Sequence, residues 1–488
     1  MIFIVNRGKV VQIFVGFAAN FLSVLFGLVT AWTSPTIFLL QSPETPLEAP
    51  MTDDEVSWMT SVIYLVAVVG SLIAGWMANV VGRKWTLFVS AIPQLVAFIL
   101  IFFAHNVTHI LISRIMSGLS IGLSIVIIPI FVAEIADKDL RTTLGNFMGV
   151  SISFGSLLGK FLPNLGGFYL TPIVVCAMVA IFTPIIAILP DSPQYLLLRN
   201  RPAEAEKALK FYRGTVKSAQ GDDVQQEFQE LQKSPSLSGQ KMSISLRDFC
   251  GGATILTILT SFWLSNHPTF TGNRTLVSFT DKLFRMSGTT LDIAMMDIAI
   301  AVLQFVASVV STFIINRFGS RLVLIYSFVI SFIAQITVGT YFTLTEHGWD
   351  LSHLSWLLFV ALALAIAIPG SAINSLAFGM AAEIVSPKLR GFLLSIYIVL
   401  TFILGFVSAN YFIALGNFWG ISGWMWIFGG WSLISIFLCF FLPDIRNTKT
   451  FDDVLELFNK KLPLKWRENT NLIHGLSVVS ANRTNYGS

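Results

Sequence analysis

The stretch Ala133-Glu134-Ile135, followed by Leu140-Arg141, returns in the second half of the chain as Ala382-Glu383-Ile384, followed by Leu389-Arg390. Two more pairs of motifs keep the same order along the chain. They are Gly82-Arg83-Lys84 with Gly319-Ser320-Arg321, and Leu189-Pro190-Asp191 with Leu442-Pro443-Asp444. Because several motifs recur in one order at similar offsets, the pattern indicates an internal duplication. The sequence therefore predicts two related halves.

The composition places both halves in a membrane. The chain has 488 residues, of which 54% are hydrophobic and only 12% charged, and no ordinary soluble domain buries so much apolar surface. A helix needs roughly 20 apolar residues to cross a bilayer, because lipid offers no partner to a free backbone amide. About twelve such stretches occur by this criterion. They centre on Phe21, Ala67, Phe98, Gly122, Phe154, Met178, Leu259, Val306, Ile330, Leu362, Ile403 and Ile434. We expect an all-α polytopic membrane protein with twelve transmembrane helices in a six-plus-six arrangement.

The charged residues, cysteines and histidines argue against several other classes of protein. The net charge is +4 and the basic residues are spread over turns and tails, so a nucleic-acid partner is not expected. Cys176, Cys250 and Cys439 are an odd number within or beside the spans, which argues against a disulfide framework. The histidines other than His267 lie in loops or the tail, without the spacing of a metal site or an activated nucleophile. We expect no enzyme activity, metal or cofactor.

The charged residues in the connections between spans predict how the chain is oriented in the membrane. Basic residues fall in alternate connections, and the positive-inside rule makes that side cytoplasmic, together with both termini. These residues include Arg83, Lys84, Lys138, Arg141, Arg317, Arg321, Lys388 and Arg390. The expected organisation is a bundle at 1–198, a cytoplasmic linker at 199–247, a second bundle at 248–445 and a tail at 446–488. Within the linker we expect a short helix from Pro202 to Lys210 and a partly mobile run from Lys217 to Lys241. Asn106 begins an outward-facing glycosylation sequon close to the membrane.

Paired charges bracket two of the cytoplasmic turns. Glu134 and Arg141 are seven residues apart, about two helical turns, and Glu383 and Arg390 repeat that spacing. Together with Arg83 and Arg321, these residues are expected to form ion pairs between the halves when the inner face closes. The alternative is that the basic turns only satisfy the positive-inside rule. Acids near the membrane are costly and that rule does not require them, so an inner gate is the preferred interpretation for the two glutamates.

These motifs resemble the sugar porter family of the major facilitator superfamily over nearly the whole chain. The stretch from Arg114 to Arg141 is similar to the family patterns R-x-x-x-G and P-x-x-x-x-E-x-x-x-x-x-x-R, and Pro190 to Leu196 is similar to P-E-S-P-R-W/Y-L. Pro443-Asp444 with Thr448-Lys449-Thr450 resembles the closing motif. The early run from Trp32 to Pro35 is similar to the facilitated trehalose transporters of insects. The resemblance implies a sugar site at the midplane between the halves and alternating access.

The chain departs from the family where the family contacts sugar. The family's seventh helix carries Q-Q-x-S-G-I-N, whereas the run here is Pro268 to Arg274, and Gly149 and Phe378 replace a Gln and a Trp. Sugar hydroxyls need convergent donors and acceptors beside an aromatic ring. The remaining candidates for these contacts, with Phe378 as the stacking ring, are Ser151, Thr269, Thr271, Asn273, Asn374 and Thr401. The alternative for each Ser or Thr is a hydrogen bond to a carbonyl of its own helix, and for Phe378 ordinary packing.

Arg274 lies within a predicted span, where a charge is expensive unless it meets water, an acid or the interface. Snorkelling toward the outer surface is the preferred interpretation. If Arg274 instead faces the cavity, we expect the chain to accept an anionic or carboxylated solute.

The resemblance also bears on energy coupling. Proton-coupled members of the family carry an acid in the first helix, whereas Val10 to Trp32 contains none. Asp292 and Asp297 begin the eighth span, and counting back from its inner end places Asp297 at the outer interface. The sequence thus predicts an uncoupled, facilitative transporter of a sugar, trehalose or a hexose, acting as a monomer in the plasma membrane. The alternatives are a sugar receptor that no longer transports and a transporter of another small solute.

Overall fold

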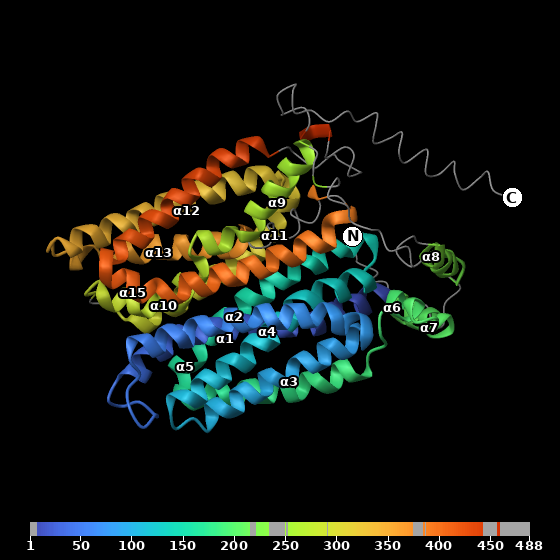
Figure 1. Ribbon diagram of the computed structural model, residues 1–488, viewed down its shortest axis with the longest axis horizontal. Helices are drawn as coiled ribbons and strands as arrows, with labels where there is room; N and C mark the ends of the chain where they lie inside the picture. The colour runs from blue at the N-terminus through green and yellow to red at the C-terminus, as the bar shows by residue number, and fades with distance from the viewer. Residues whose placement is uncertain are drawn as a thin grey trace.

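The computed structural model describes residues 7–214, 221–233, 249, 252–289, 291–373, 384, 385, 387–442 and 456–458. Two helical bundles lie side by side along their length, and the linker helices sit at one end of the first bundle (Figure 1). We call that end the inner end, following the predicted orientation. The opposite end, which carries the connections at 42–52 and 347–351, is called the outer end.

The first bundle is made of five long helices that cross the membrane six times. They are α1 (Arg7–Gln41), α2 (Asp53–Val80), α3 (Arg83–Phe102), α4 (Val107–Ile135) and α5 (Lys138–Ile188). Helix α5 has 51 residues and is broken at Gly166 and Gly167, where Gly167 has a φ of 69°, so α5 contains two spans. Glycine tolerates this positive φ because it has no Cβ.

The second bundle repeats this plan with more interruptions. Its elements are α9 (Gly252–Phe270), α10 (Asn273–Met286), α11 (Ile293–Phe318), α12 (Ser320–Glu346), η2 (Ser352–Leu354), α13 (Ser355–Ile368), η3 (Pro369–Ile373) and α15 (Pro387–Phe441). Helix α15 is broken at Trp419 and Gly420 and therefore also contains two spans. Helices α9 and α10 form one interrupted span. The described helices account for twelve crossings, and the predicted major facilitator architecture is confirmed.

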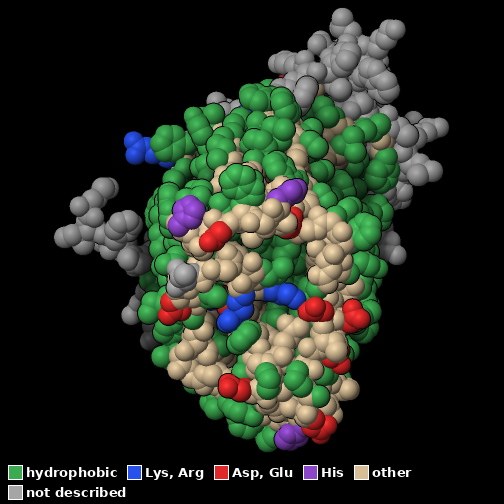
Figure 2. Space-filling model, turned by 90° about the vertical axis from the view of Figure 1, so that its left-hand side faces the viewer, with side chains coloured by type: hydrophobic (Ala, Val, Ile, Leu, Met, Phe, Trp, Pro, Cys, Tyr) green, Lys and Arg blue, Asp and Glu red, His purple; other side chains and the backbone are tan. Residues whose placement is uncertain are grey.

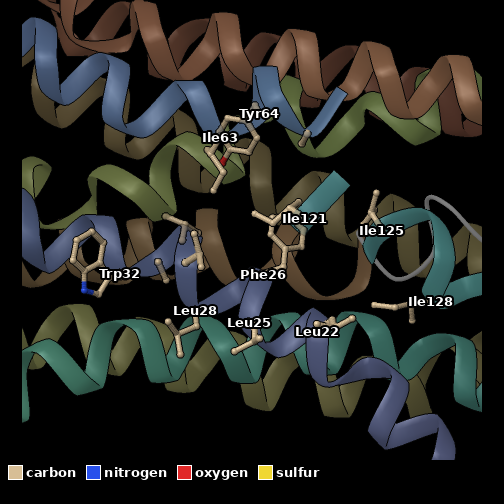
Figure 3. Packing of buried hydrophobic residues seen from close by; sticks show 14 of the residues in the cluster. Leu22, Leu25, Phe26, Leu28, Trp32, Ile63, Tyr64, Ile121, Ile125 and Ile128 are labelled. Carbon is tan, nitrogen blue, oxygen red and sulfur yellow. The ribbon is translucent and has the colours of Figure 1, made fainter. Parts of the chain in front are cut away.

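Close helix contacts hold the first bundle together. A Cβ on Gly155 of α5 would overlap the carbonyl oxygen of Val24 on α1, and a Cβ on Gly27 would overlap that of Ile152. Small residues allow such backbone approach, which is how membrane helices gain dispersion energy without a hydrophobic driving force between them. The buried residues Leu25, Leu28 and Trp32 of α1 belong to one hydrophobic core cluster (Figure 3).

The two bundles contact each other from the outer end to about the middle of the membrane. The contacts join α1 with α10, α2 with α15, and α5 with α11. Asn410 donates from Nδ2 to Ser61 Oγ at 2.9 Å, and the Ser153 and Ser308 hydroxyls are 2.6 Å apart. Nearer the outer end, the rings of Trp58, in the second turn of α2, and Phe406 lie 5.9 Å apart. The structure is therefore closed at its outer end.

The linker contains three helices, α6 (Pro193–Leu198), α7 (Pro202–Arg213) and α8 (Gly221–Lys233). Helix α7 covers the predicted helix and ends at Gly214 in the left-handed conformation. The expectation of irregular chain across 217–241 was wrong for the α8 segment. Val224 and Phe228 are buried one turn apart and Leu231 packs beside them, so a short apolar face stabilises this helix.

Candidate substrate site and gates

The seventh span is interrupted between the halves. Helix α9 ends at Phe270 and α10 begins at Asn273, with Gly272 at a φ of 69° between them. A Cβ on Gly272 would overlap the Phe428 ring, so the position requires glycine for its backbone and for its space. Gln335 of α12 fixes the break, since its Nε2 donates to the Thr271 carbonyl at 2.9 Å and its Oε1 accepts from Ser432 at 2.7 Å. Broken helices expose backbone ends to a ligand within a membrane.

The polar residues predicted beside the break lie together, but several use their side chains internally. Thr271 donates to the His267 carbonyl at 3.1 Å, and Thr401 donates to the Tyr397 carbonyl at 2.7 Å. Each hydroxyl thus bonds to the carbonyl four residues before it. This local bond was the alternative to a substrate contact for these residues. Thr269 reaches the Thr401 carbonyl at 3.5 Å.

Two other residues predicted to contact the substrate lie on α10 and α5. Asn273 Nδ2 donates to the Ile366 carbonyl at 2.7 Å and so ties α10 to α13. Ser151 is buried on α5. Asn374 and Phe378 lie outside the described residues.

Three buried amides near the break were not predicted as site residues. Asn266 Oδ1 accepts from Thr401 at 3.0 Å, Gln335 holds the break, and Gln304 on α11 has a buried Oε1 without a hydrogen-bond partner within the described chain. Each is an amide inside an apolar span, where a polar group is costly unless it is used. That signal was available in the sequence.

Arg274 lies between the halves, and the preferred prediction that it snorkels to the outer surface was wrong. Its guanidinium group stacks on the Tyr64 ring of α2 at 5.8 Å and on the Phe402 ring of α15 at 5.6 Å. Its Nη1 is buried without a hydrogen-bond partner among the described residues. Its neighbour in the span, His267, is fully buried and accepts from Trp431 Nε1 at 3.3 Å, which gives it a packing role.

Arg114 on α4 is a second buried arginine that the sequence analysis did not single out as a site residue. It donates to the Val29 carbonyl and to Thr33 Oγ1, both at 3.0 Å, and lies over the Trp32 ring at 4.6 Å. Only 1% of its surface is exposed, and its Nε has no hydrogen-bond partner in the described structure.

A buried ion pair joins the halves nearer the outer end. Lys160 Nζ on α5 lies 2.6 Å from Asp297 Oδ1 on α11, with side-chain exposures of 0% and 1%. Lys160 also donates to Thr280 at 3.3 Å, and Ser34 on α1 donates to Asp297 Oδ2 at 3.2 Å. Asp297 lies in the second turn of α11, near the outer end as counted, but it is buried and not exposed to the interface. Counting residues locates a side chain along a span but does not show whether a neighbouring helix covers it.

A second layer of charges closes the outer surface around α10. Lys282 pairs with Asp53 of α2 at 2.8 Å, and Arg285 pairs with Asp281 at 2.7 Å while lying 3.6 Å over the Phe38 ring of α1. Basic side chains gather at the centre of the outer face, with acidic ones toward its rim (Figure 2). This layer and the buried pair form the outer gate of the described conformation.

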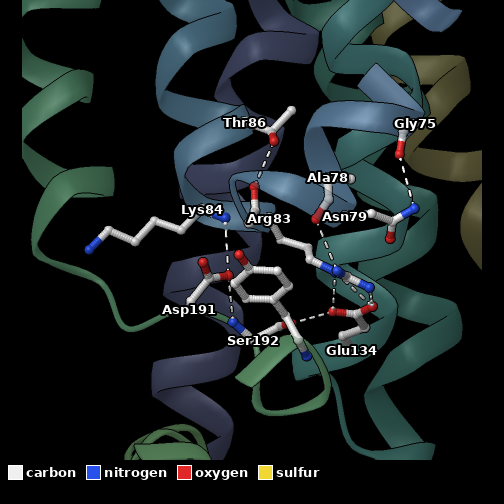
Figure 4. Close-up of polar contacts among 11 residues, drawn as sticks. Gly75, Ala78, Asn79, Arg83, Lys84, Thr86, Glu134, Asp191 and Ser192 are labelled. Atoms are coloured by element: carbon white, nitrogen blue, oxygen red, sulfur yellow. Dashed lines mark hydrogen bonds and ion pairs between the residues drawn. The ribbon is translucent and has the colours of Figure 1, made fainter. Parts of the chain in front are cut away.

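At the inner end, Arg83 and Glu134 pair within the first half. Arg83 donates from Nε and Nη2 to the Glu134 carboxylate at distances of 2.9–3.1 Å, and Ser192 also donates to that carboxylate (Figure 4). Asp191 accepts from the backbone N–H of Lys84 at 3.2 Å, and burial raises the pKa of the Asp191 carboxyl above its usual value. This cluster ties the turn after α2 to α4 and α6.

The rest of the predicted inner gate is only partly described. Arg321 donates to the carbonyls of Cys439 at 3.3 Å and Phe440 at 3.0 Å, within the second half. Glu383 and the side chains of Arg141 and Arg390 lie outside the described residues. The pairing of these charges across the halves stays a prediction.

At the outer end, Asn106 caps α4, and its side chain accepts from the His109 backbone N–H at 3.1 Å. Its glycosylation stays a prediction.

Known proteins with similar sequences are sugar transporters. The chain is 27% identical over 453 residues to the facilitated trehalose transporter Tret1 of Polypedilum vanderplanki, covering 91% of this chain and 87% of that protein. It is 26% identical over 450 residues to Tret1 of Anopheles gambiae, covering 91% of this chain. The chain spans 55% of the length of the Anopheles protein.

Solved structures show the same fold. The proton:xylose symporter XylE bound to 6-bromo-6-deoxy-D-glucose superposes with a TM-score of 0.73 at 18% identity, covering 92% of this chain and all of that one. The inward open conformation of XylE from E. coli gives a TM-score of 0.71 over 93% of this chain. The family model described as sugar (and other) transporter matches residues 15–458. The chain therefore belongs to the sugar (and other) transporter family and has the major facilitator fold.

Proposed function

We propose that this protein is a facilitative sugar transporter that works by alternating access. The observation that carries the proposal is the interrupted span α9–α10 between the halves, held by Gln335 and closed from the outside by the gate around α10. In membrane transporters, broken helices of this kind lie at the depth where a substrate must bind. Rocking of the halves would open the outer gate and close the inner end.

Trehalose or a hexose is the proposed substrate class. Tret1 proteins, as their name states, are trehalose transporters, and the matched family is one of sugar transporters. The buried amides of Asn266, Asn273 and Gln304 supply the kind of donors and acceptors that sugar hydroxyls need. We place the protein in the plasma membrane as a functional monomer with both termini in the cytosol.

Transport is proposed to be uncoupled from protons. Helix α1 carries no acid between Val10 and Trp32, so Arg114 has no carboxylate partner on the helix that it contacts. Asp297 is held by Lys160 in the outer gate. Neither arrangement leaves a buried acid free to carry a proton across the membrane.

Uptake of labelled trehalose and glucose into cells that display the protein tests the proposal. We expect saturable uptake that a proton ionophore leaves unchanged and that Glu134→Gln reduces at least tenfold, because the buried Arg83 loses its carboxylate. The matched control is Glu204→Gln, whose exposed pair with Arg201 is worth about 1 kcal/mol or less. Absence of uptake from a protein shown to be at the surface would instead favour the receptor alternative.

A further inference from the structure

A groove lies at the inner end of the first bundle, where the start of α3, the end of α5 and helix α7 meet. Its volume is about 570 Å³. Trp85, Ile188 and Phe211 contribute apolar side chains to its lining, and Lys84 and Lys207 contribute ammonium groups. One cavity is thus lined both by side chains that suit hydrocarbon and by cations.

The two lysines of the groove are available to a ligand. Neither Lys84 nor Lys207 forms an ion pair within the described part of the chain. Lys84 Nζ lies 5.0 Å over the Trp85 ring, and its side chain extends away from the Arg83–Glu134 pair (Figure 4). Their charges therefore stay uncompensated on the wall of the groove.

The acids that line the groove have partners of their own. Asp191 accepts from the backbone N–H groups of Lys84 at 3.2 Å and of Ser192 at 2.8 Å. Glu204 pairs with Arg201 at 2.6 Å on the first turn of α7. These contacts occupy the carboxylates, so an incoming anion meets the lysines first.

The groove lies at the depth of the lipid headgroups. Trp85 is the third residue of α3, and 44% of its surface is exposed. Tryptophan is enriched at this level of a membrane because its ring is apolar and its N–H is polar. Helix α7, beyond the last residue of α5, supplies the side of the groove that faces water.

An exposed apolar surface leads from the groove along the bundle. On α3, Trp85, Ile92 and Ile99 are exposed and recur every seven residues, so they lie on one face. On α5, Ile181 and Ile188 repeat that spacing and are 68% and 82% exposed. Helices α3 and α5 contact each other. A soluble anion would leave this surface uncovered, whereas an acyl chain would cover it.

We propose that the groove binds an anionic phospholipid of the inner leaflet. Its phosphate lies near the ammonium groups of Lys84 and Lys207, and one acyl chain follows the exposed faces of α3 and α5. Basic side chains close to a membrane surface attract such lipids. All parts of the site belong to the first bundle and α7, so the inference holds whichever solute the protein carries.

The test maps where a lipid lies on the full-length protein in phosphatidylcholine vesicles. A trace of phosphatidylserine with a photoactivatable acyl chain is added, and the labelled peptides are identified after illumination. We expect labelling at the start of α3 and the end of α5 to exceed that of other lipid-facing segments at least fivefold. The same label on phosphatidylcholine should show no such enrichment.

Lys84→Gln and Lys207→Gln should each lower the enrichment about fivefold, the contribution of one basic residue close to an anionic lipid. Lys210→Gln is the matched control, because it removes the same charge from the same helix outside the groove. Uniform labelling, or equal enrichment of phosphatidylcholine, would refute the site. Displacement of the label by excess glycerol 3-phosphate would show a site for soluble anions and overturn the lipid assignment.

Discussion

At the scale of single residues, position 272 requires glycine for two separate reasons. Its φ of 69° is unfavourable for any residue with a Cβ, and the Phe428 ring occupies the space that a Cβ would need. Gly288 has nearly the same φ, 66°, but open space around it. The two glycines therefore separate the backbone cost from the packing cost.

We expect Gly272→Ala to destabilise the protein by about 3 kcal/mol, and Gly288→Ala by about 1 kcal/mol. The first variant carries both costs and also displaces the break in the seventh span, so sugar uptake should fall with stability. Thermal unfolding in detergent and uptake at equal surface expression check this. Equal loss of stability in the two variants would show that the Phe428 ring moves aside freely.

At the scale of elements, Arg213 and Tyr212 at the end of α7 attach the linker helices to the first bundle. Arg213 at the end of α7 pairs with Asp137 at 2.8 Å and with Glu227 of α8 at 2.6 Å, and donates to the Ile135 carbonyl at 2.9 Å. Gln12 of α1 donates to the Tyr212 carbonyl at 3.1 Å and to Asp137 at 2.9 Å. The end of α7 is thereby fixed to the turn between α4 and α5.

Replacing Arg213 with Ala should release α8 without unfolding the bundles. Because the arginine joins three elements and is mostly buried, its loss should increase the rate of proteolysis between α7 and α9 at least tenfold. The measurement is limited digestion in the membrane, followed by mapping of the cut. Lys210→Ala is the control, since its pair with Glu206 stays within α7 and is partly exposed. No change in the cutting rate would mean that the apolar face of α8 holds the linker alone.

At the scale of the whole molecule, the Lys160–Asp297 pair connects the halves across the closed outer end. It is buried only while that end is closed, because its partners belong to different bundles. Removing one partner leaves an uncompensated buried charge, at a cost of about 3–5 kcal/mol. That cost applies to the closed state and not to an outward-open one.

Lys160→Met should therefore shift the population toward the outward-open state by more than about 100-fold, since 1.4 kcal/mol corresponds to a factor of ten. The reaction of a cysteine at Ser61→Cys with an impermeant maleimide added outside reports this opening. Lys160→Met combined with Asp297→Leu removes both charges and should return labelling toward its original rate. Lys210→Met, which breaks a partly exposed pair within α7 and away from the outer gate, is the control. Unchanged labelling in Lys160→Met would exclude the pair from the outer gate.

How much of the structure could be predicted from the sequence differs between single residues, helices and the whole molecule. Span number, the two halves and the helix at α7 were predictable because they depend on apolar length and local helix propensity. The α8 helix was missed because its apolar face is only three residues long. Gln304 and Lys160 each stand out as a polar residue in an apolar span, but a single polar residue does not show which helix supplies its partner.

The sequence by itself determined the membrane class, the twelve crossings and the family, since these follow from the hydrophobic length of each segment and from motifs at its ends. Only the tertiary structure decided which charges meet. Lys160 and Asp297 are 137 residues apart, and Arg274 reaches Tyr64 from the other half of the chain. In a low-dielectric interior the energy of a charge depends on its partner. Which partner it meets is determined by how the helices pack and not by their order in the chain.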